Sequence, residues 1–302
     1  MNSARRSVIV HVPASTSNCG AGFDSLGLGL ALYNRVTLQA TANGTAAPER
    51  EADARAVAMV QEAANCFFQT TGVGSAGFQF RIDGEVPPAR GLGSSVTVIA
   101  GVLAGLDAIH GTKLSPKALV AMATTLEGHP DNASAGILGG FTVSRCDSET
   151  GAYVDSVRVE VPDELSFVVA SPEVQLLTKE SRGALPTTLP YFDAVKSINS
   201  AAYLAAVFAT REYKKLRYAV GDFMHEPYRL PKIRGGRESI NAGIAAGALT
   251  GWLSGSGSSV LCVCERATAG NVALAMTAAF KRTNVDCETR VLAADNRGLR
   301  VE

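Results

Sequence analysis

A glycine-rich segment between a predicted strand and a predicted helix is the first place where this sequence could do chemistry. It follows an alternating run at 78–82, precedes an apolar run at 96–109, and consists of Pro87, Pro88, Ala89, Arg90, Gly91, Leu92, Gly93, Ser94 and Ser95. Its glycines let the backbone turn tightly and approach a ligand closely. We expect Ser94 or Ser95 to cap the helix, whose unpaired N–H groups would then bind an anion such as phosphate. An ordinary turn capped by serine explains the pattern equally well, and neither of the two best-known phosphate-loop motifs is present.

A second group of polar residues lies at the end of another predicted helix. Ser115 and Pro116 have the types expected at a helix start, and the helix ends in Glu-Gly-His-Pro-Asp-Asn at 127–132. A histidine alone is more often structural, and a glutamate alone at a helix end is more often solvated. Because four polar groups crowd into six positions, a functional site is favoured here.

Two further segments have the composition of functional loops. Residues 13–24 are small, polar and glycine-rich, and they include Asn18 and Asp24 between apolar runs. Residues 253–259 form a second glycine and serine run just before a predicted strand at 260–264. Binding residues are concentrated on such loops, although flexible surface turns look the same.

The composition limits the class of protein. The 302 residues predict two domains, which we place at 1–162 and 163–302. Net charge is zero, so no electrostatic argument favours nucleic acid or an anionic membrane as a partner. We expect no membrane span and no signal peptide, and six scattered cysteines without a C-x-x-C pair indicate reduced cytoplasmic thiols and no metal site.

Hydrophobic periodicity predicts an α+β architecture. The expected strands are 7–12, 35–40, 78–82, 141–145, 153–161, 165–170, 260–264 and 285–292. The expected helices are 54–68, 96–109, 116–127, 178–182, 191–210, 238–247 and 268–281. Residues 226–231 contain two prolines and are expected to form a loop.

These segments together resemble the GHMP small-molecule kinases, and within them the homoserine kinases. The matching motifs are P-A-S-T-S-N-x-G-x-G-F-D at 13–24, the glycine-rich segment at 87–95, E-G-H-P-D-N at 127–132, T-K-E-S-R at 178–182, E-P-Y-R at 226–229 and the glycine and serine run at 254–259. The resemblance implies an N-terminal α/β domain with the phosphate loop and a C-terminal ferredoxin-like α+β sandwich, with ATP and Mg²⁺ between them. It also implies a homodimer, and transfer of the γ-phosphoryl group of ATP to the side-chain hydroxyl of L-homoserine in threonine biosynthesis.

The resemblance assigns one set of residues to the nucleotide and the metal. The nucleotide set is Pro87, Pro88, Ala89, Arg90, Gly91, Leu92, Gly93, Ser94, Ser95, Val96, Thr97, Ser254, Gly255, Ser256 and Gly257. Ser95 and Glu127 would hold Mg²⁺, which prefers oxygen ligands. Three positions depart from the family. Val96 stands where relatives have alanine, Ala58 where they carry an asparagine near the adenine, and Cys19 where they carry an aliphatic or small residue.

A second set is assigned to a zwitterionic acceptor. Arg182 and Arg229 would bind its carboxylate in bidentate fashion, and Asp24 its ammonium. The residues expected to orient the hydroxyl are Asn18, His129 and Asn132, and Thr178 is expected to support a closing loop.

The base remains open at this stage. Asp131 could take the proton, or the proton could pass to phosphate. We favour Asn132 facing the acceptor, with Asp131 in a structural or electrostatic role.

Three other functions compete. Another GHMP kinase for a small alcohol such as mevalonate fits the glycine-rich segments, but mevalonate has no ammonium to pair with Asp24. A decarboxylase of the same superfamily is a second possibility. A nucleotide-binding relative without catalytic activity is a third, and the presence of Glu127, Ser95 and both glycine-rich segments argues against it.

Overall fold

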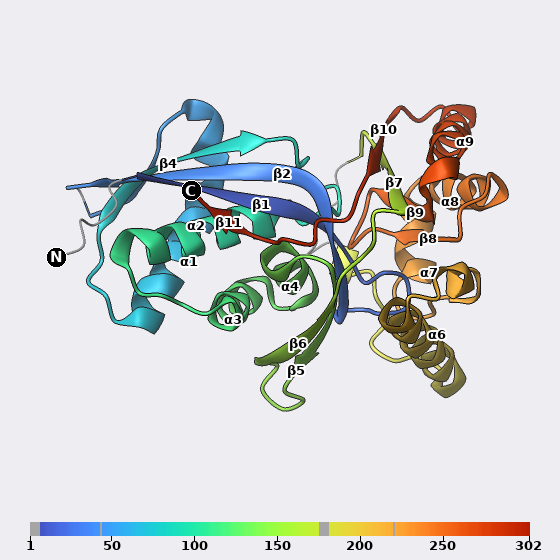
Figure 1. Cartoon of the computed structure of the whole chain (residues 1–302), viewed down its shortest axis with the longest axis horizontal. Coiled ribbons are helices and arrows are strands. Elements are labelled where there is room, and N and C mark those ends of the chain that lie inside the picture. The colour runs from blue at the N-terminus through green and yellow to red at the C-terminus, as the bar shows by residue number, and fades with distance from the viewer. Residues whose placement is uncertain (1–6, 43, 175–180, 220) are drawn as a thin grey trace.

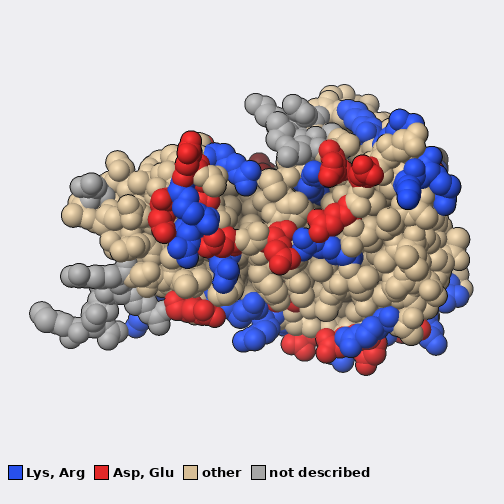
Figure 2. Space-filling model, turned by 90° about the horizontal axis from the view of Figure 1, so that it is seen from above, with Lys and Arg blue, Asp and Glu red and all other residues tan. Residues whose placement is uncertain are grey.

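A computed structural model describes residues 7–42, 44–174, 181–219 and 221–302 of the chain. They form two lobes, each with its own sheet and helices (Figure 1). Among the described residues, no helix is both long enough and apolar enough to cross a membrane. Basic and acidic side chains are interspersed on the face drawn in Figure 2, as expected for a chain without net charge.

The larger lobe is built on a seven-stranded sheet in the order β11-β1-β2-β4-β3, with β5 joined to β2 and β6 joined to β5. All of its pairings are antiparallel except that of β3 with β4. The strands are β1 (Ser7–Ser17), β2 (Leu26–Thr41), β3 (Ala46–Pro48), β4 (Gly77–Gly84), β5 (Phe141–Cys146), β6 (Tyr153–Val159) and β11 (Arg300–Val301).

Helices cover one face of this sheet (Figure 1). They are the 3₁₀ helix η1 (Glu51–Ala56) and the α-helices α1 (Val57–Thr71), α2 (Ser94–His110), α3 (Pro116–Glu127) and α4 (Asp131–Leu138). Helix α2 is apolar on nearly all sides, and most of its residues are buried against β1, β2 and its neighbouring helices. A helix of this composition must lie in the middle of a core, so its N-terminus is held firmly where it meets the cavity described below.

The smaller lobe has a four-stranded antiparallel sheet in the order β10-β7-β9-β8. Its strands are β7 (Leu165–Pro172), β8 (Thr250–Leu253), β9 (Val260–Glu265) and β10 (Cys287–Leu292). Its helices are α6 (Tyr191–Thr210), α7 (Glu226–Arg229), α8 (Gly236–Ala245) and α9 (Ala269–Arg282), with 3₁₀ turns η2 (Tyr213–Tyr218), η3 (Leu230–Lys232) and η4 (Arg266–Thr268).

The two lobes share an apolar core and the chain crosses between them twice. Phe141 of β5 stacks on Phe208 of α6, with 4.0 Å between ring centroids. After β10 the chain returns to the larger lobe, where β11 pairs with β1 through Val301 and Arg300 (Figure 1). The predicted α+β two-lobe architecture is therefore confirmed. The domain boundary between residues 162 and 163 stays a prediction. Strand β11, near residue 302, lies in the same sheet as β1.

Several local expectations were wrong. The strand expected at 7–12 continues to Ser17, and the strand expected at 35–40 begins already at Leu26. Neither Ser94 nor Ser95 caps α2, because the N-cap is Gly93 with φ of 66° and no side-chain hydrogen bond. The expected loop at 226–231 is helical, since proline is compatible with the first turn of a helix.

Candidate active site

A cavity of about 400 Å³ lies between the lobes, where the predicted site segments meet. Its wall includes residues of the loop after β1, of the glycine-rich loop before α2, of the 127–132 segment and of the glycine and serine run after β8. Six segments that are far apart in sequence, counting those that carry Arg182 and Arg229, thus converge on one space.

The glycine-rich loop approaches this cavity with a backbone that requires glycine. Gly91 and Gly93 have φ of 74° and 66°, in the left-handed region that side chains disfavour. A Cβ at Gly91 would lie 2.1 Å from the Ser254 carbonyl oxygen, and one at Gly93 would lie 2.1 Å from Ser15 Oγ. Because the first intrahelical N–H bond of α2 is made by Thr97, the preceding amides of its first turn point toward the cavity without a helical partner. They form a donor set suited to phosphate oxygens.

The second glycine and serine run packs directly on this loop. Ser254 is fully buried, and its hydroxyl lies 2.6 Å from the Gly91 carbonyl and 2.9 Å from Thr16 Oγ1. Asn18 also bridges the lobes, since its Nδ2 donates to the Gly255 carbonyl at 3.0 Å. The two runs therefore form one continuous surface.

Ser95 and Glu127 lie together on the cavity wall. Burial raises the pKa of the Glu127 carboxyl, and the neighbouring Ser95 hydroxyl opposes this shift without cancelling it. A carboxylate and a hydroxyl at the mouth of a phosphate loop are the oxygen ligands that Mg²⁺ takes in proteins, so this donor set fits the metal.

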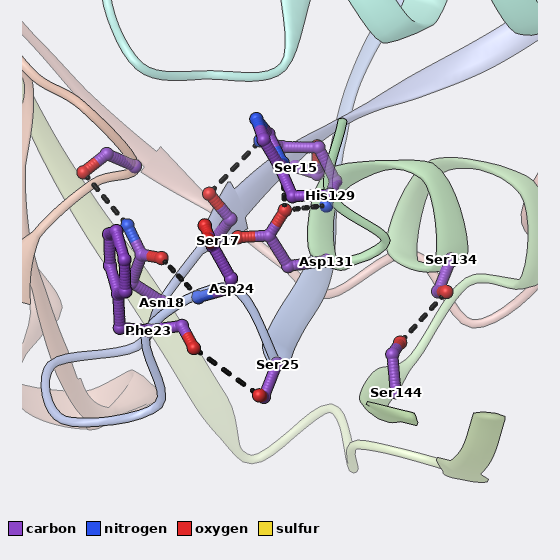
Figure 3. Close-up of polar contacts among 12 residues, drawn as sticks. Ser15, Ser17, Asn18, Phe23, Asp24, Ser25, His129, Asp131, Ser134 and Ser144 are labelled. Atoms are coloured by element: carbon purple, nitrogen blue, oxygen red, sulfur yellow. Dashed lines mark hydrogen bonds and ion pairs between the residues drawn. The ribbon is translucent and has the colours of Figure 1, made fainter. Parts of the chain in front are cut away.

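His129 and Asp131 form a buried ion pair at the start of α4 (Figure 3). Nδ1 of His129 donates to Oδ1 of Asp131 at 2.6 Å, and the same oxygen accepts the Asn132 N–H at 2.8 Å. Burial acts to raise the pKa of Asp131, but these bonds and one from Ser17 lower it below its ordinary value. Burial likewise opposes the charged form of His129, and Asp131 raises its pKa nonetheless. Each partner of the pair therefore favours the charged form of the other.

Asn132 is held by two serines of β1. Its Nδ2 donates to Ser17 Oγ at 3.0 Å and its Oδ1 accepts from Ser15 Oγ at 2.9 Å. Both Asp131 and Asn132 border the cavity, and the expectation that Asn132 is the one that faces the acceptor stays a prediction. Ser15 and Ser17 were not assigned a role from sequence, although both lie in the loop-like motif that the structure places on β1.

Arg182, Arg229 and Asp24 meet at one end of the cavity. Arg182 makes a bidentate ion pair with Asp24, at 3.0 and 2.8 Å. Arg229 is only 3% exposed; its Nε donates to the Ser181 carbonyl at 3.3 Å, and within the described parts of the chain no carboxylate lies in ion-pair range of it. Burial, followed by the charge of Arg182, lowers the pKa of Arg229 to about 10.

The opposite end of the cavity is more apolar. Ala56, Met59, Ile82, Val86 and Val98 line it, and Ala58 points outward and is exposed. Asn34, which the sequence did not single out, stabilises this end.

The Asn34 side chain joins three elements there. Its Nδ2 donates to Thr97 Oγ1 at 2.8 Å and its Oδ1 accepts from the Val86 N–H at 3.2 Å. The only sequence feature that could have revealed Asn34 was an asparagine at a position where the alternating pattern predicts a buried residue.

Not every predicted residue reaches the wall. Leu92, Val96, Thr97 and Ser254 have buried side chains, so any ligand contact from them would come from the backbone. Those four, together with Pro87 and Gly257, are absent from the lining of the cavity. Thr178 lies outside the described residues.

Comparisons with known proteins agree with this geometry. The family model for the N-terminal domain of GHMP kinases matches residues 58–140, and that for the GHMP kinase C-terminal domain matches 208–282. A homoserine kinase from Moorella thermoacetica is 39% identical over 294 residues, covering 96% of this chain and 98% of that protein. Another, from Carboxydothermus hydrogenoformans, is 33% identical over 300 residues, covering 96% of this chain and 95% of the relative. The crystal structure of homoserine kinase from Cytophaga hutchinsonii superposes with a TM-score of 0.89 at 25% identity, covering 100% of this chain and 99% of that one.

Fold, glycine-rich loop and cavity thus define the class: a two-domain small-molecule kinase of the GHMP type. Within that class, the full-length similarity is to one group of enzymes. The chain belongs to the homoserine kinase family.

Proposed function

We propose that this protein transfers the γ-phosphoryl group of ATP to the side-chain hydroxyl of L-homoserine, the step that commits this amino acid to threonine biosynthesis. The observation that carries the proposal is the pairing of charges at one end of the cavity. Arg229 is a buried cation without a carboxylate partner among the described residues, and it lies beside Arg182 and the carboxylate of Asp24. A small zwitterion satisfies such a set, whereas a ligand with one charge leaves part of it unpaired.

The nucleotide would lie along the other part of the cavity. The apolar wall at Met59 and Ile82 suits the adenine, and the amides at the start of α2 suit the β- and γ-phosphates. Ser95 and Glu127 would hold Mg²⁺, which when bound offsets the charge that develops on the transferred group. Phosphoryl transfer needs mainly positioning and charge neutralisation, and these residues supply both.

The acceptor would lie between the arginines and the His129–Asp131 pair. Arg229 and Arg182 would bind its carboxylate, and Asp24 would exchange part of its pairing with Arg182 for the substrate ammonium. Asn18 and Asn132 have their amides bonded to Gly255, Ser15 and Ser17, so they shape this end of the site as fixed groups.

The proton of the hydroxyl would pass to phosphate. Asp131 is a poor general base, because its pKa is lowered and its Oδ1 is already bonded to His129 and Asn132. Its negative charge instead raises the pKa of His129 beside the site.

We further propose a homodimer in the cytoplasm. Tyr191, Phe192, Val195 and Ile198 of α6 are 42–77% exposed and form an apolar stripe along one helix, which a second copy of the chain would cover. All six cysteines are unpaired, in keeping with a reducing compartment.

A substrate panel tests the proposed function. ADP release would be followed in a coupled assay with ATP, Mg²⁺ and one of four acceptors: L-homoserine, L-serine, mevalonate and 3-aminopropan-1-ol, which lacks the carboxylate. We expect the highest kcat/KM with L-homoserine and a loss of at least about a hundredfold with the carboxylate-free alcohol. Equal activity with mevalonate would contradict the proposal.

A further inference from the structure

Phe23 lies against two arginines of like charge. Its ring centroid is 5.2 Å from the guanidinium carbon of Arg229 and 5.3 Å from that of Arg182. A cation within about 6 Å of an aromatic face is attracted by the ring quadrupole, and the attraction grows when the cation is desolvated. Arg229 is buried, and the charge of Arg182 opposes its own. The ring therefore adds to the compensation that Arg229 receives, because no carboxylate among the described residues lies in ion-pair range of it.

The ring of Phe23 is itself held by His225. The two rings stack with 5.3 Å between centroids and an interplanar angle of 27°. His225 is fully buried, and its Nε2 lies 2.8 Å from the Gly20 carbonyl. A carbonyl can only accept, so Nε2 carries the proton.

His225 is neutral in this position. Its Nδ1 has no partner within the described residues, and burial lowers the pKa of the ring. A neutral imidazole can stack on Phe23 without adding a third positive charge beside the arginines.

Both ends of this stack are fixed by backbone hydrogen bonds. Asp222 accepts from the N–H groups of His225 and Glu226 at 2.8 and 2.7 Å, which anchors the start of α7, the helix that ends at Arg229. On the other side, Asn18 Oδ1 accepts the Asp24 N–H at 3.0 Å, which closes the loop that carries Phe23 (Figure 3). Phe23 thus connects the loop after β1, in the larger lobe, to helix α7 of the smaller lobe, which carries Arg229.

We infer that Phe23 is a positioning residue for the acceptor amino acid, which holds the guanidinium groups of Arg182 and Arg229 at a fixed separation for one carboxylate. The inference rests on the proposed function. Phe23 is absent from the lining of the cavity, so it acts through the arginines and not by touching the substrate.

Phe23→Leu and Phe23→Tyr distinguish this role from simple packing. Leucine keeps an apolar side chain and removes the aromatic face, whereas tyrosine keeps the face. We expect Phe23→Leu to raise the KM for homoserine about tenfold with the KM for ATP within about twofold of wild type. Phe23→Tyr should stay within about threefold for both substrates, and thermal melts would establish that each variant is folded.

A double-mutant cycle with Arg182→Gln gives a second, independent measurement. If Phe23 acts through the arginines, the loss caused by Phe23→Leu becomes smaller when Arg182 is already absent. Additive effects would overturn the inference, as would an unchanged homoserine KM, an equal loss for ATP, or a Phe23→Tyr variant as impaired as Phe23→Leu. Failure of the wild-type protein to phosphorylate homoserine would instead refute the proposed function, so the two failures are separable. If Phe23→Leu does not fold, Phe23→Met takes its place in the same cycle.

Discussion

At the scale of single residues, the metal assignment depends on Ser95 and Glu127, which lie beside each other on the cavity wall. Glu127→Gln and Ser95→Ala should each lower kcat by about a hundredfold or more, because each removes a preorganised oxygen that neutralises charge in the transition state. The measurement is kcat as a function of Mg²⁺ concentration. Glu62→Gln, on the exposed side of α1, is the matched control. Near-normal activity of Glu127→Gln at low Mg²⁺ would rule out its role as a ligand.

The carboxylate assignment depends on Arg229. Arg229→Lys keeps a positive charge but removes the planar fork, so we expect the KM for homoserine to rise about ten- to a hundredfold while that for ATP changes little. Arg217→Lys, at an exposed position of η2, serves as the control. Equal losses for both substrates would indicate a phosphate role for Arg229.

The path of the proton is tested by Asp131→Asn beside Asn132→Ala. If phosphate takes the proton, Asp131→Asn keeps activity within about two orders of magnitude. A general base would cost about a hundred- to ten-thousandfold, and its removal would abolish the acidic limb of the pH profile. Thermal melts are needed for both variants because both side chains carry the hydrogen bonds that join the start of α4 to its surroundings.

At the scale of elements, Glu226 joins helix α7 to the strand that precedes the glycine and serine run. Its Oε1 accepts the Leu253 N–H at 2.7 Å, and burial raises its pKa to about 7 from an ordinary 4.5. A group whose pKa is raised on folding gives stability that is present below the unfolded pKa and lost as pH rises through the folded one. The wild-type protein should therefore lose stability between pH 4.5 and about 7 through this group.

Glu226→Gln keeps the acceptor oxygen and removes the titration. As pH rises from 4.5 to about 7, the unfolding free energy of the variant should increase by about 1–3 kcal/mol relative to that of the wild-type protein. Urea unfolding at several pH values measures it, with Glu238→Gln, at an exposed position of α8, as the control. A stability difference that does not change with pH would mean that Glu226 is not buried as a titrating group.

The helices and strands also show how much of the fold could be predicted from the sequence alone. Periodicity placed α6 at 191–210 with the bounds it has in the structure, and Ser115 caps α3 as its type predicted. The extension of β1 through 13–17 could not be predicted, because small polar residues carry no period-2 pattern and are extended only by pairing with β2.

The candidate site likewise contains residues that the sequence could predict and residues that it could not. Segments with an unusual local composition, such as the glycine-rich loop and the 127–132 cluster, were identifiable, and they do meet at the cavity. Asn34 and the two serines that hold Asn132 depend on partners far away in the sequence, 52 to 117 residues distant. Their contribution exists only once the sheet and helices have packed.

At the scale of the whole molecule, the apolar stripe on α6 predicts the oligomeric state. Ile198→Glu or Phe192→Glu should convert the proposed dimer to a monomer, because each places a charge in a surface that a second copy would desolvate. Light scattering coupled to size exclusion gives the mass directly. Leu274→Glu on α9, where the leucine is 73% exposed, is a control that should leave the mass unchanged. A monomeric wild-type protein would contradict the proposal.

The return of the chain end to the first sheet has a consequence for how the protein is made. Strand β11 pairs with β1, and the N–H of Glu302 donates to the Ile9 carbonyl at 2.8 Å. During synthesis β1 thus waits until the smaller lobe and then β11 have been made before that edge is paired. Until then it offers a row of unpaired N–H and C=O groups to other nascent chains. The larger lobe therefore gains this pairing only after the smaller lobe has been synthesised.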